Sequence, residues 1–314
     1  MLMTSYYRLG MLRAEAGFGH PVFYGAFCTI MIPLNMYFVE HSSQKRERLL
    51  YSGCLTFHLV ALVLSNSRGS LLAFSCLAVL IFIIRLVKKS VKKLMATYLP
   101  IGAAALAVLI LVASVSPMGV SFLGGIADSV ISSVVPGEIH HAGATEPVQT
   151  EPIQTEPDHA GESTHVSIDY GDNLNGVSSR LKQLSGIEWT LSRQPVFGFG
   201  SNAHVRGLIC YKMNGEDWWR TETFDMALVA IVCQYGIVGL CGYIALYGSF
   251  LKSVFSKKYR GEPLMEFLGL AFAAYLICLC SISSLDKMGW VLMALIVCAV
   301  NIFNKCPAIQ LRNR

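Results

Sequence analysis

Residues 70–93 read SLLAFSCLAVLIFIIRLVKKSVKK, an apolar run of helical length that ends in a cluster of basic side chains. A helix rises about 1.5 Å per residue, so about 20 apolar residues cross the roughly 30 Å hydrocarbon core of a bilayer. The run lacks the alternation of apolar and polar residues that membrane-spanning β-strands show. Because only helices and closed barrels satisfy their backbone groups in lipid, this stretch predicts a transmembrane helix.

The composition of the 314-residue chain extends this prediction to the whole protein. Apolar residues make up 54% of it, charged residues only 14%, and the mean hydropathy is +0.51. Soluble domains carry about 25% charged residues, so the chain is neither an ordinary soluble domain nor a disordered protein. Ten cysteines are too few for a disulfide scaffold, and a net charge of +5 is too diffuse to indicate a nucleic-acid partner.

Seven apolar stretches have the length of a membrane span, and together they predict an all-α fold, a polytopic transmembrane helix bundle. They are residues 21–39, 49–64, 70–87, 98–115, 226–251, 264–282 and 289–303.

Basic residues cluster on one side of these spans. They lie in the connections after the first, third and fifth spans and at the C-terminus, whereas the two short connections on the other side carry only Arg68 and Lys287. The positive-inside rule therefore predicts that the basic side is cytoplasmic. Residues 1–20 then fall outside. An N-out start is one explanation, and a fragment that has lost upstream spans is the simpler one, which the odd number of spans also fits.

The long hydrophilic stretch of residues 116–225 lies on the predicted outer side. We therefore expect three parts: residues 1–115 with four spans, this extracytoplasmic loop, and residues 226–314 with three spans and a cytoplasmic tail. Within the loop, residues 119–135 are weakly amphipathic, and residues 137–172 repeat Thr-Glu-Pro and hold eight acidic residues but no Lys or Arg. Regular prolines and like charges resist folding, so we read this insertion as solvated and without a catalytic role.

A metal site in this insertion is the alternative interpretation. Its four histidines match no tight ligand spacing, so we predict no metal and no other cofactor. These histidines are His140, His141, His159 and His165. Order is expected to return at Asn173, with a capped amphipathic helix over residues 178–189 and a turn over residues 195–200.

Arginines at the outer face are the first candidates for chemistry. Arg68 stands between two spans, where a cation is costly unless it faces a cavity, a ligand or the interface. Guanidinium groups bind phosphate oxygens bidentately, so anion binding competes with a solvated surface role for each of the others. The others are Arg180, Arg193, Arg206 and Arg220.

Candidate acids, bases and sugar-binding groups occur in the same region. A carboxylate half-buried at a membrane edge works as an acid or base when its pKa is raised, although Asp225 would also suit a helix N-cap. His204 and Glu222 are the other candidates. Three tryptophans form either an interfacial belt or a platform for sugar rings, and a histidine before the first span is a similar case. These residues are Trp189, Trp218, Trp219 and His20.

Four motifs carry a resemblance to a known family. They are GFGHP at residues 17–21, SRG at residues 67–69, the run from an arginine to a tryptophan at residues 180–189 followed by PVFGFG at residues 195–200, and YGIVGL at residues 235–240. In this order and on these sides of the membrane, they resemble the O-antigen ligase and polysaccharide polymerase superfamily of bacterial membrane proteins.

The resemblance covers about residues 8–250 and implies a metal-independent, GT-C-like glycosyltransferase at the outer face of the bacterial inner membrane. The implied donor is a glycan on undecaprenyl diphosphate, whose departing diphosphate Arg68 and Arg180, with Arg206 and Arg220, would stabilise. A base from among Asp225, His204 and Glu222 would deprotonate the acceptor hydroxyl. A chain-length regulator and a flippase are the further partners that the resemblance suggests.

One departure from the family bears on the reaction. Ligases often carry a His-Asn pair about eleven residues before the glycine that Gly236 matches, and this chain has Asp225 and Met226 there. We therefore favour a polymerase that joins lipid-linked repeat units over a ligase that transfers glycan to lipid A-core. A non-enzymatic transporter is the third reading; it would place ionisable groups at span centres or show paired broken helices, whereas we find no charge deep in any span and the polar residues lie on one face.

Overall fold

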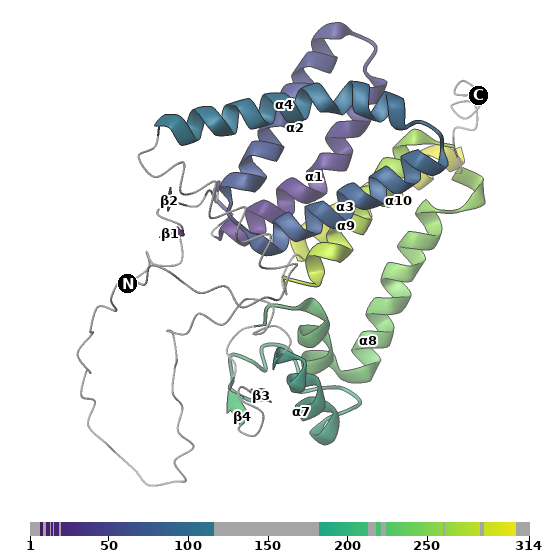
Figure 1. Ribbon diagram of the computed structural model, residues 1–314. Coiled ribbons are helices and arrows are strands. Elements are labelled where there is room, and N and C mark those ends of the chain that lie inside the picture. Colours follow the sequence, from purple (N-terminus) through teal and green to yellow (C-terminus); the bar gives the residue numbers. More distant parts are fainter. Residues whose placement is uncertain are drawn as a thin grey trace.

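The computed structural model describes residues 7–8, 11–12, 14, 16–18, 20–115, 182–212, 218–220, 224–259, 261–282 and 286–305. It confirms the all-α, polytopic prediction, with helices at all seven expected stretches (Figure 1). Six of these helices are long and apolar enough to span a membrane. They are α1 (Pro21–His41), α2 (Lys45–Leu64), α3 (Arg68–Val87), α4 (Val91–Val115), α8 (Ala227–Val254) and α10 (Asp286–Lys305). The seventh, α9 (Pro263–Leu279), is apolar but has only 17 residues.

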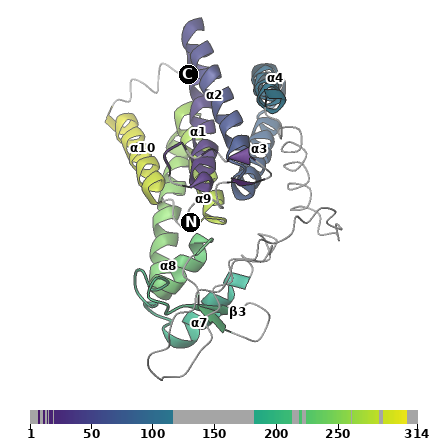
Figure 2. The ribbon, with the colours of Figure 1, turned by 90° about the vertical axis from the view of Figure 1, so that its left-hand side faces the viewer.

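α1 and α9 form the centre of the bundle. They pack on each other, α2 and α3 flank α1, and α3 and α10 flank α9 (Figure 2). The largest fully buried side chains include Phe267, Phe272 and Tyr275, all from α9. A helix enclosed by other helices has little contact with lipid, which explains how α9 remains buried although it is short.

α4 crosses α2 at an angle and contacts only part of it (Figure 1). Val60 of α2 packs with Ala105 and Leu109 of α4 in a small separate cluster. Toward the start of α2, Leu49 and Leu50 are 76% and 63% exposed. The beginning of α2 therefore has an open apolar face.

Ion pairs tie the helices together at the basic end of the bundle. Arg85 donates to Glu40 at 2.8 Å, and the hydroxyl of Tyr98 donates to the same carboxylate at 2.7 Å. Lys88 pairs with Glu266 at the start of α9. These contacts join α1, α3, α4 and α9 where the sequence clusters its cations.

A second, smaller unit lies beyond the other end of the bundle (Figures 1 and 2). We call it the loop unit: residues 182–212, 218–220 and 224–235. It contains α7 (Ser185–Arg193), strands β3 (Cys210–Lys212) and β4 (Trp218–Arg220) paired as a hairpin, and the start of α8. Its own core includes Ala203, Ile209, Val229 and Cys233. Two further short elements are the hairpin β1 (Tyr7–Arg8) and β2 (Met11–Leu12) and the 3₁₀ turn η1 (Lys257–Tyr259).

Of the predicted helix over residues 178–189, the structure describes residues 182–189: Lys182 and Gln183 are helical, Leu184 forms a turn, and α7 begins at Ser185. α7 ends at Arg193, and Leu184 at its N-cap makes no side-chain capping bond. The amphipathic stretch 119–135 and the acidic insertion 137–172 with its histidines lie outside the described residues.

Candidate functional site

The main irregularity of the loop unit is a break in α8 at Gly236. This residue has φ 63° and ψ −158°, a conformation that only glycine adopts readily. The turn at residues 195–200, which confirms the prediction for that segment, packs into the break. The amides of Phe199 and Gly200 donate to the carbonyls of Cys233 and Gln234 at 2.9 and 2.8 Å.

The turn also accepts hydrogen bonds from the other side of the break. The amides of Ile237 and Val238 donate to the carbonyls of Pro195 and Val196 at 2.9 and 3.2 Å. A break in a helix at membrane depth leaves backbone groups without partners, and such irregularity is tolerated where protein supplies them. The turn therefore replaces the hydrogen bonds that α8 loses.

Two glycines make this contact sterically feasible. A Cβ on Gly198 would lie 2.7 Å from the amide nitrogen of Gly236, and a Cβ on Gly236 would lie 2.6 Å from the amide nitrogen of Gly198. The PVFGFG and YGIVGL motifs are thus the two halves of one backbone contact, which we call the glycine lock.

The break also revises the fifth predicted span. From Ile237 to Val254, α8 is roughly 27 Å long at about 1.5 Å per residue, close to the thickness of the hydrocarbon core. The part of α8 after the break is long enough to cross the bilayer, whereas the part before it, Ala227 to Tyr235, belongs to the loop unit. The predicted span of residues 226–251 therefore joined two helices that differ in direction and in packing.

The glycine lock also fixes His204. The Nδ1 atom of His204 lies 3.3 Å from the Nε2 atom of Gln234, whose backbone carbonyl is part of the lock. The imidazole also contacts the ring of Phe224, with centroids 5.1 Å apart. Arg206 donates to the carbonyl of Phe199 at 2.8 Å and so braces the turn.

Asp225 stands at the entry to α8, and Gln183 holds it through two hydrogen bonds. The Gln183 amide donates to Oδ2 of Asp225 at 3.2 Å, and its carbonyl accepts from the Asp225 backbone amide at 2.9 Å. The alternative that Asp225 caps α8 is wrong, because Met226 is the N-cap and no side chain bonds there. The carboxylate is half-buried and oriented instead by a neutral amide.

Tyr211 lies close to this carboxylate. Burial raises the pKa of the Tyr211 phenol above its ordinary value, and the negative charge of Asp225 adds to the effect. Next to it, burial raises the pKa of the Cys210 thiol, while the charges of Arg220 and Arg193 oppose the rise. Both groups therefore stay protonated at neutral pH, and the phenol can donate a hydrogen bond beside Asp225.

The tryptophans of the loop unit form a stack with cations. The guanidinium of Arg193 lies 3.3 Å from the ring centroid of Trp189, whose indole N–H donates to the Leu208 carbonyl at 3.1 Å. The ring of Trp218 lies 4.9 Å from Trp189, and Lys212 lies 4.8 Å from the Trp218 ring. Arg193 therefore covers one face of Trp189, the ring for which the sequence suggested contact with a sugar.

Arg68 belongs to a different part of the structure, the tight corner between α2 and α3. Ser67 caps α3 by accepting from the Ser70 amide, and the Ser70 hydroxyl donates to the Val22 carbonyl of α1 at 3.3 Å. Gly25 of α1 lets this corner approach, since a Cβ there would lie 2.7 Å from the hydroxyl of Ser70. The Nε atom of Arg68 is buried and has no hydrogen-bond partner among the described residues.

His20 lies at the same end of the bundle. Its Nδ1 atom accepts from the Val22 amide at 3.2 Å, so it caps α1. This capping role accounts for a histidine before Pro21, although the sequence suggested glycan contact. In the loop unit, the Arg220 side chain lies beside Gly207, with its Nη1 atom 3.9 Å from the position that a Cβ would take there.

Other predicted site residues lie outside the described part of the chain. They are Arg180, Glu222 and the side chain of Trp219. The structure thus places Asp225, His204, Arg193, Arg206 and Arg220 in the loop unit. Within the described residues, no three His, Cys, Asp or Glu side chains lie close enough to hold a metal ion.

Four polar residues that sequence reasoning missed take defined positions in the structure. Gln183 and Gln234 orient Asp225 and His204, and Tyr211 lies beside Asp225. His58 lies within the span α2, where its Nδ1 atom is 2.7 Å from the Cys54 carbonyl and 3.4 Å from the Asn35 amide. His58 could have been found from the sequence, because an ionisable residue within a span is unusual. Gln183 and Gln234 have no comparable feature in the sequence.

Comparison with known proteins gives one match. A protein-family model described as O-antigen ligase matches residues 53–244, more than half of the chain. The matched region runs from α2 through the corner that contains Arg68 and the loop unit to the second half of α8. No curated protein and no solved structure matches the chain.

Proposed function

The chain belongs to the O-antigen ligase family and is thus a multi-pass membrane protein of the ligase or polymerase type of glycosyltransferase, and we propose that it is a polymerase. It would join oligosaccharide repeat units carried on undecaprenyl diphosphate at the outer face of the bacterial inner membrane. The positive-inside rule supports this orientation, because the cations cluster at the end of the bundle opposite the loop unit. The division into residues 1–115, 116–225 and 226–314 follows from the same topology.

In this proposal, arginines stabilise the departing diphosphate. Arg68 offers a partly buried guanidinium whose Nε atom has no hydrogen-bond partner among the residues that the structure describes, and Arg206 and Arg220 offer two more cations from the loop unit. Arg180 would complete the group. Preorganised cations aimed at developing negative charge are the usual means of transition-state stabilisation, and they work without a metal ion.

Asp225 carries the choice of polymerase over ligase. It takes the position where ligases often carry a His-Asn pair, and Gln183 holds its carboxylate half-buried at the head of α8. A carboxylate in such a position accepts a proton from the acceptor hydroxyl as the new glycosidic bond forms. His204 and Glu222 are the alternative bases.

A ligase is the second candidate. The family description itself favours it, and His204, oriented by Gln234, offers an imidazole base of the kind that ligases use. The two readings differ in the acceptor, which is a second lipid-linked repeat unit for a polymerase and a lipid A-core sugar for a ligase.

Surface glycan from producing cells tests the proposal. We expect Arg68→Ala and Asp225→Asn each to convert long glycan chains into single repeat units on gels. Lys252→Ala, an exposed cation at the opposite end of α8, is the matched control and should leave the chain length unchanged. Normal polymer length with lost transfer to lipid A-core would identify a ligase, and unchanged glycan in both variants would refute the assigned residues.

A further inference from the structure

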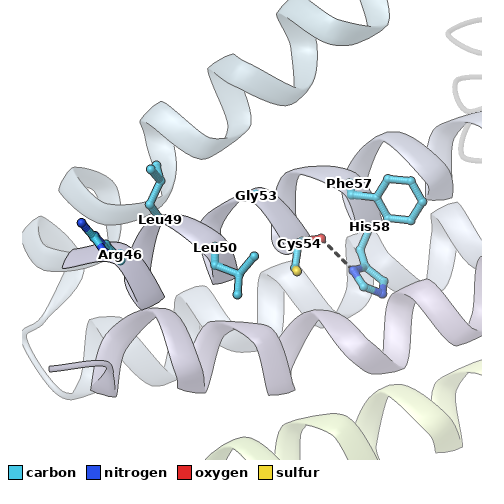
Figure 3. A pocket seen from close by; sticks show the side chains of 7 residues that line it. All are labelled: Arg46, Leu49, Leu50, Gly53, Cys54, Phe57 and His58. Atoms are coloured by element: carbon cyan, nitrogen blue, oxygen red, sulfur yellow. Dashed lines mark hydrogen bonds between the residues drawn. The ribbon is translucent and has the colours of Figure 1, made fainter. Parts of the chain in front are cut away.

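An open hollow lies on α2, at the end of the bundle opposite the loop unit (Figure 3). It measures about 540 Å³ and is lined by side chains of α2. α4 packs only on the later part of α2, around Val60, and this divergence leaves the first part uncovered. The hollow therefore faces the membrane rather than the protein core.

The lining residues form one stripe along the helix. Residues 46, 49, 53 and 57 follow one another by three or four positions, so they share one face of α2. Gly53 has no side chain and therefore leaves a notch in this face. The notch is open, because a Cβ there would meet nothing within 4 Å. Leu49 and Phe57, which are 76% and 60% exposed, stand on either side of the notch.

This shape favours a flexible chain over another helix. Close helix packing in membranes needs several small residues along the contact, whereas two large side chains flank the single glycine. Arg46 stands at one end of the stripe, at the predicted level of the lipid headgroups. His58 turns from the other end toward α1, where its ring lies 6.0 Å from Phe27.

We propose that this hollow binds an anionic phospholipid, with the headgroup phosphate on Arg46 and an acyl chain along Leu49, Gly53 and Phe57. From residue 46 to residue 57 the helix rises roughly 16 Å, which matches the hydrocarbon depth of one leaflet, about 15 Å. Basic side chains beside spans attract anionic headgroups, and the first turn of α2 is basic overall, with Glu47 as its one acidic residue.

Native mass spectrometry of the purified full-length chain tests this site. Phosphatidylglycerol should bind more tightly than zwitterionic phosphatidylcholine. Arg46→Gln should weaken phosphatidylglycerol roughly five-fold, the effect expected for one basic side chain near a membrane surface. Gly53→Leu should remove the bound lipid, because the new side chain fills the notch without a clash.

Two matched variants control for charge and bulk. Lys252→Gln removes an exposed cation on the same predicted side of the membrane, and Gly102→Leu adds the same side chain on exposed α4, where a Cβ also meets nothing within 4 Å. Both should bind phosphatidylglycerol like the wild type. Equal binding of the two lipids, or equal loss in the controls, would overturn the proposal.

A dimer that Gly53→Leu converts to monomer would also overturn the proposal, since the face would then belong to a second copy. The site does not depend on the proposed polymerase activity. Lipid binding and glycan length are separate readouts, so either proposal can fail alone.

Discussion

Replacing Gly236 by alanine should dismantle the glycine lock. The residue has φ 63° and ψ −158°, and a Cβ there would meet the Val196 carbonyl and lie 2.6 Å from the Gly198 amide nitrogen. Both contacts are with backbone, which cannot rotate out of the way as a flexible side chain can. The turn at residues 195–200 must therefore move off α8.

The expected cost has two parts. Holding alanine in this backbone conformation costs about 1–3 kcal/mol. Displacing the turn also breaks the four hydrogen bonds across the lock, each with a net contribution of about 0.5–1.5 kcal/mol. With all four hydrogen bonds lost, we expect Gly236→Ala to destabilise the loop unit by about 3–9 kcal/mol, and by less where part of the turn stays bound.

Hydrogen exchange and thermal unfolding of the purified chain measure this effect. The amides of Phe199 and Gly200 should lose protection in Gly236→Ala, and polymer formation should fall with them. Gly242→Ala is the matched control on the same helix, because a Cβ there meets nothing within 4 Å. It should be neutral or stabilising by up to about 1 kcal/mol. Equal stability and equal amide protection in the two variants would refute the lock.

Three further predictions follow from polar contacts. The raised pKa of Tyr211 means that the folded chain holds the phenol proton more tightly than the unfolded chain does, so stability is lost as the pH rises above about 10. In Tyr211→Phe, the melting temperature should therefore fall less steeply with pH in this alkaline range. Gln183→Glu places a second carboxylate beside Asp225, and the two repel each other until one is protonated. The melting temperature of this variant should therefore rise on acidification, whereas that of Gln183→Met should not. Arg85→Ala leaves Glu40 buried without its cation and should cost about 3 kcal/mol in unfolding experiments, and adding Glu40→Gln should recover part of it.

The spans were predictable from sequence because the requirement for crossing a bilayer can be read directly from hydropathy and charge. Each needs a long apolar run, and cation clusters mark one side, so residues 70–87 closely match α3. The break in α8 was not predictable in the same way. Residues 226–251 remain apolar across Gly236, and hydropathy does not register a change of backbone direction.

The candidate site shows a similar division. Motif resemblance singled out Gly198 and Gly236 as parts of separate motifs, but their contact joins segments far apart in sequence. Asp225 was expected as a base or a cap, and only the structure shows that Gln183 orients it. No sequence pattern marks a glutamine that orients another side chain, so the role of Gln183 could be recognised only once the structure placed it beside Asp225.

A reconstituted reaction distinguishes a polymerase from a ligase. The purified chain in liposomes would be given a single lipid-linked repeat unit on undecaprenyl diphosphate, with no nucleotide sugar and no lipid A-core. We expect a ladder of longer lipid-linked glycans with release of undecaprenyl diphosphate, and loss of the ladder in Arg68→Ala. Glycan that stays one unit long until lipid A-core is supplied would contradict this expectation.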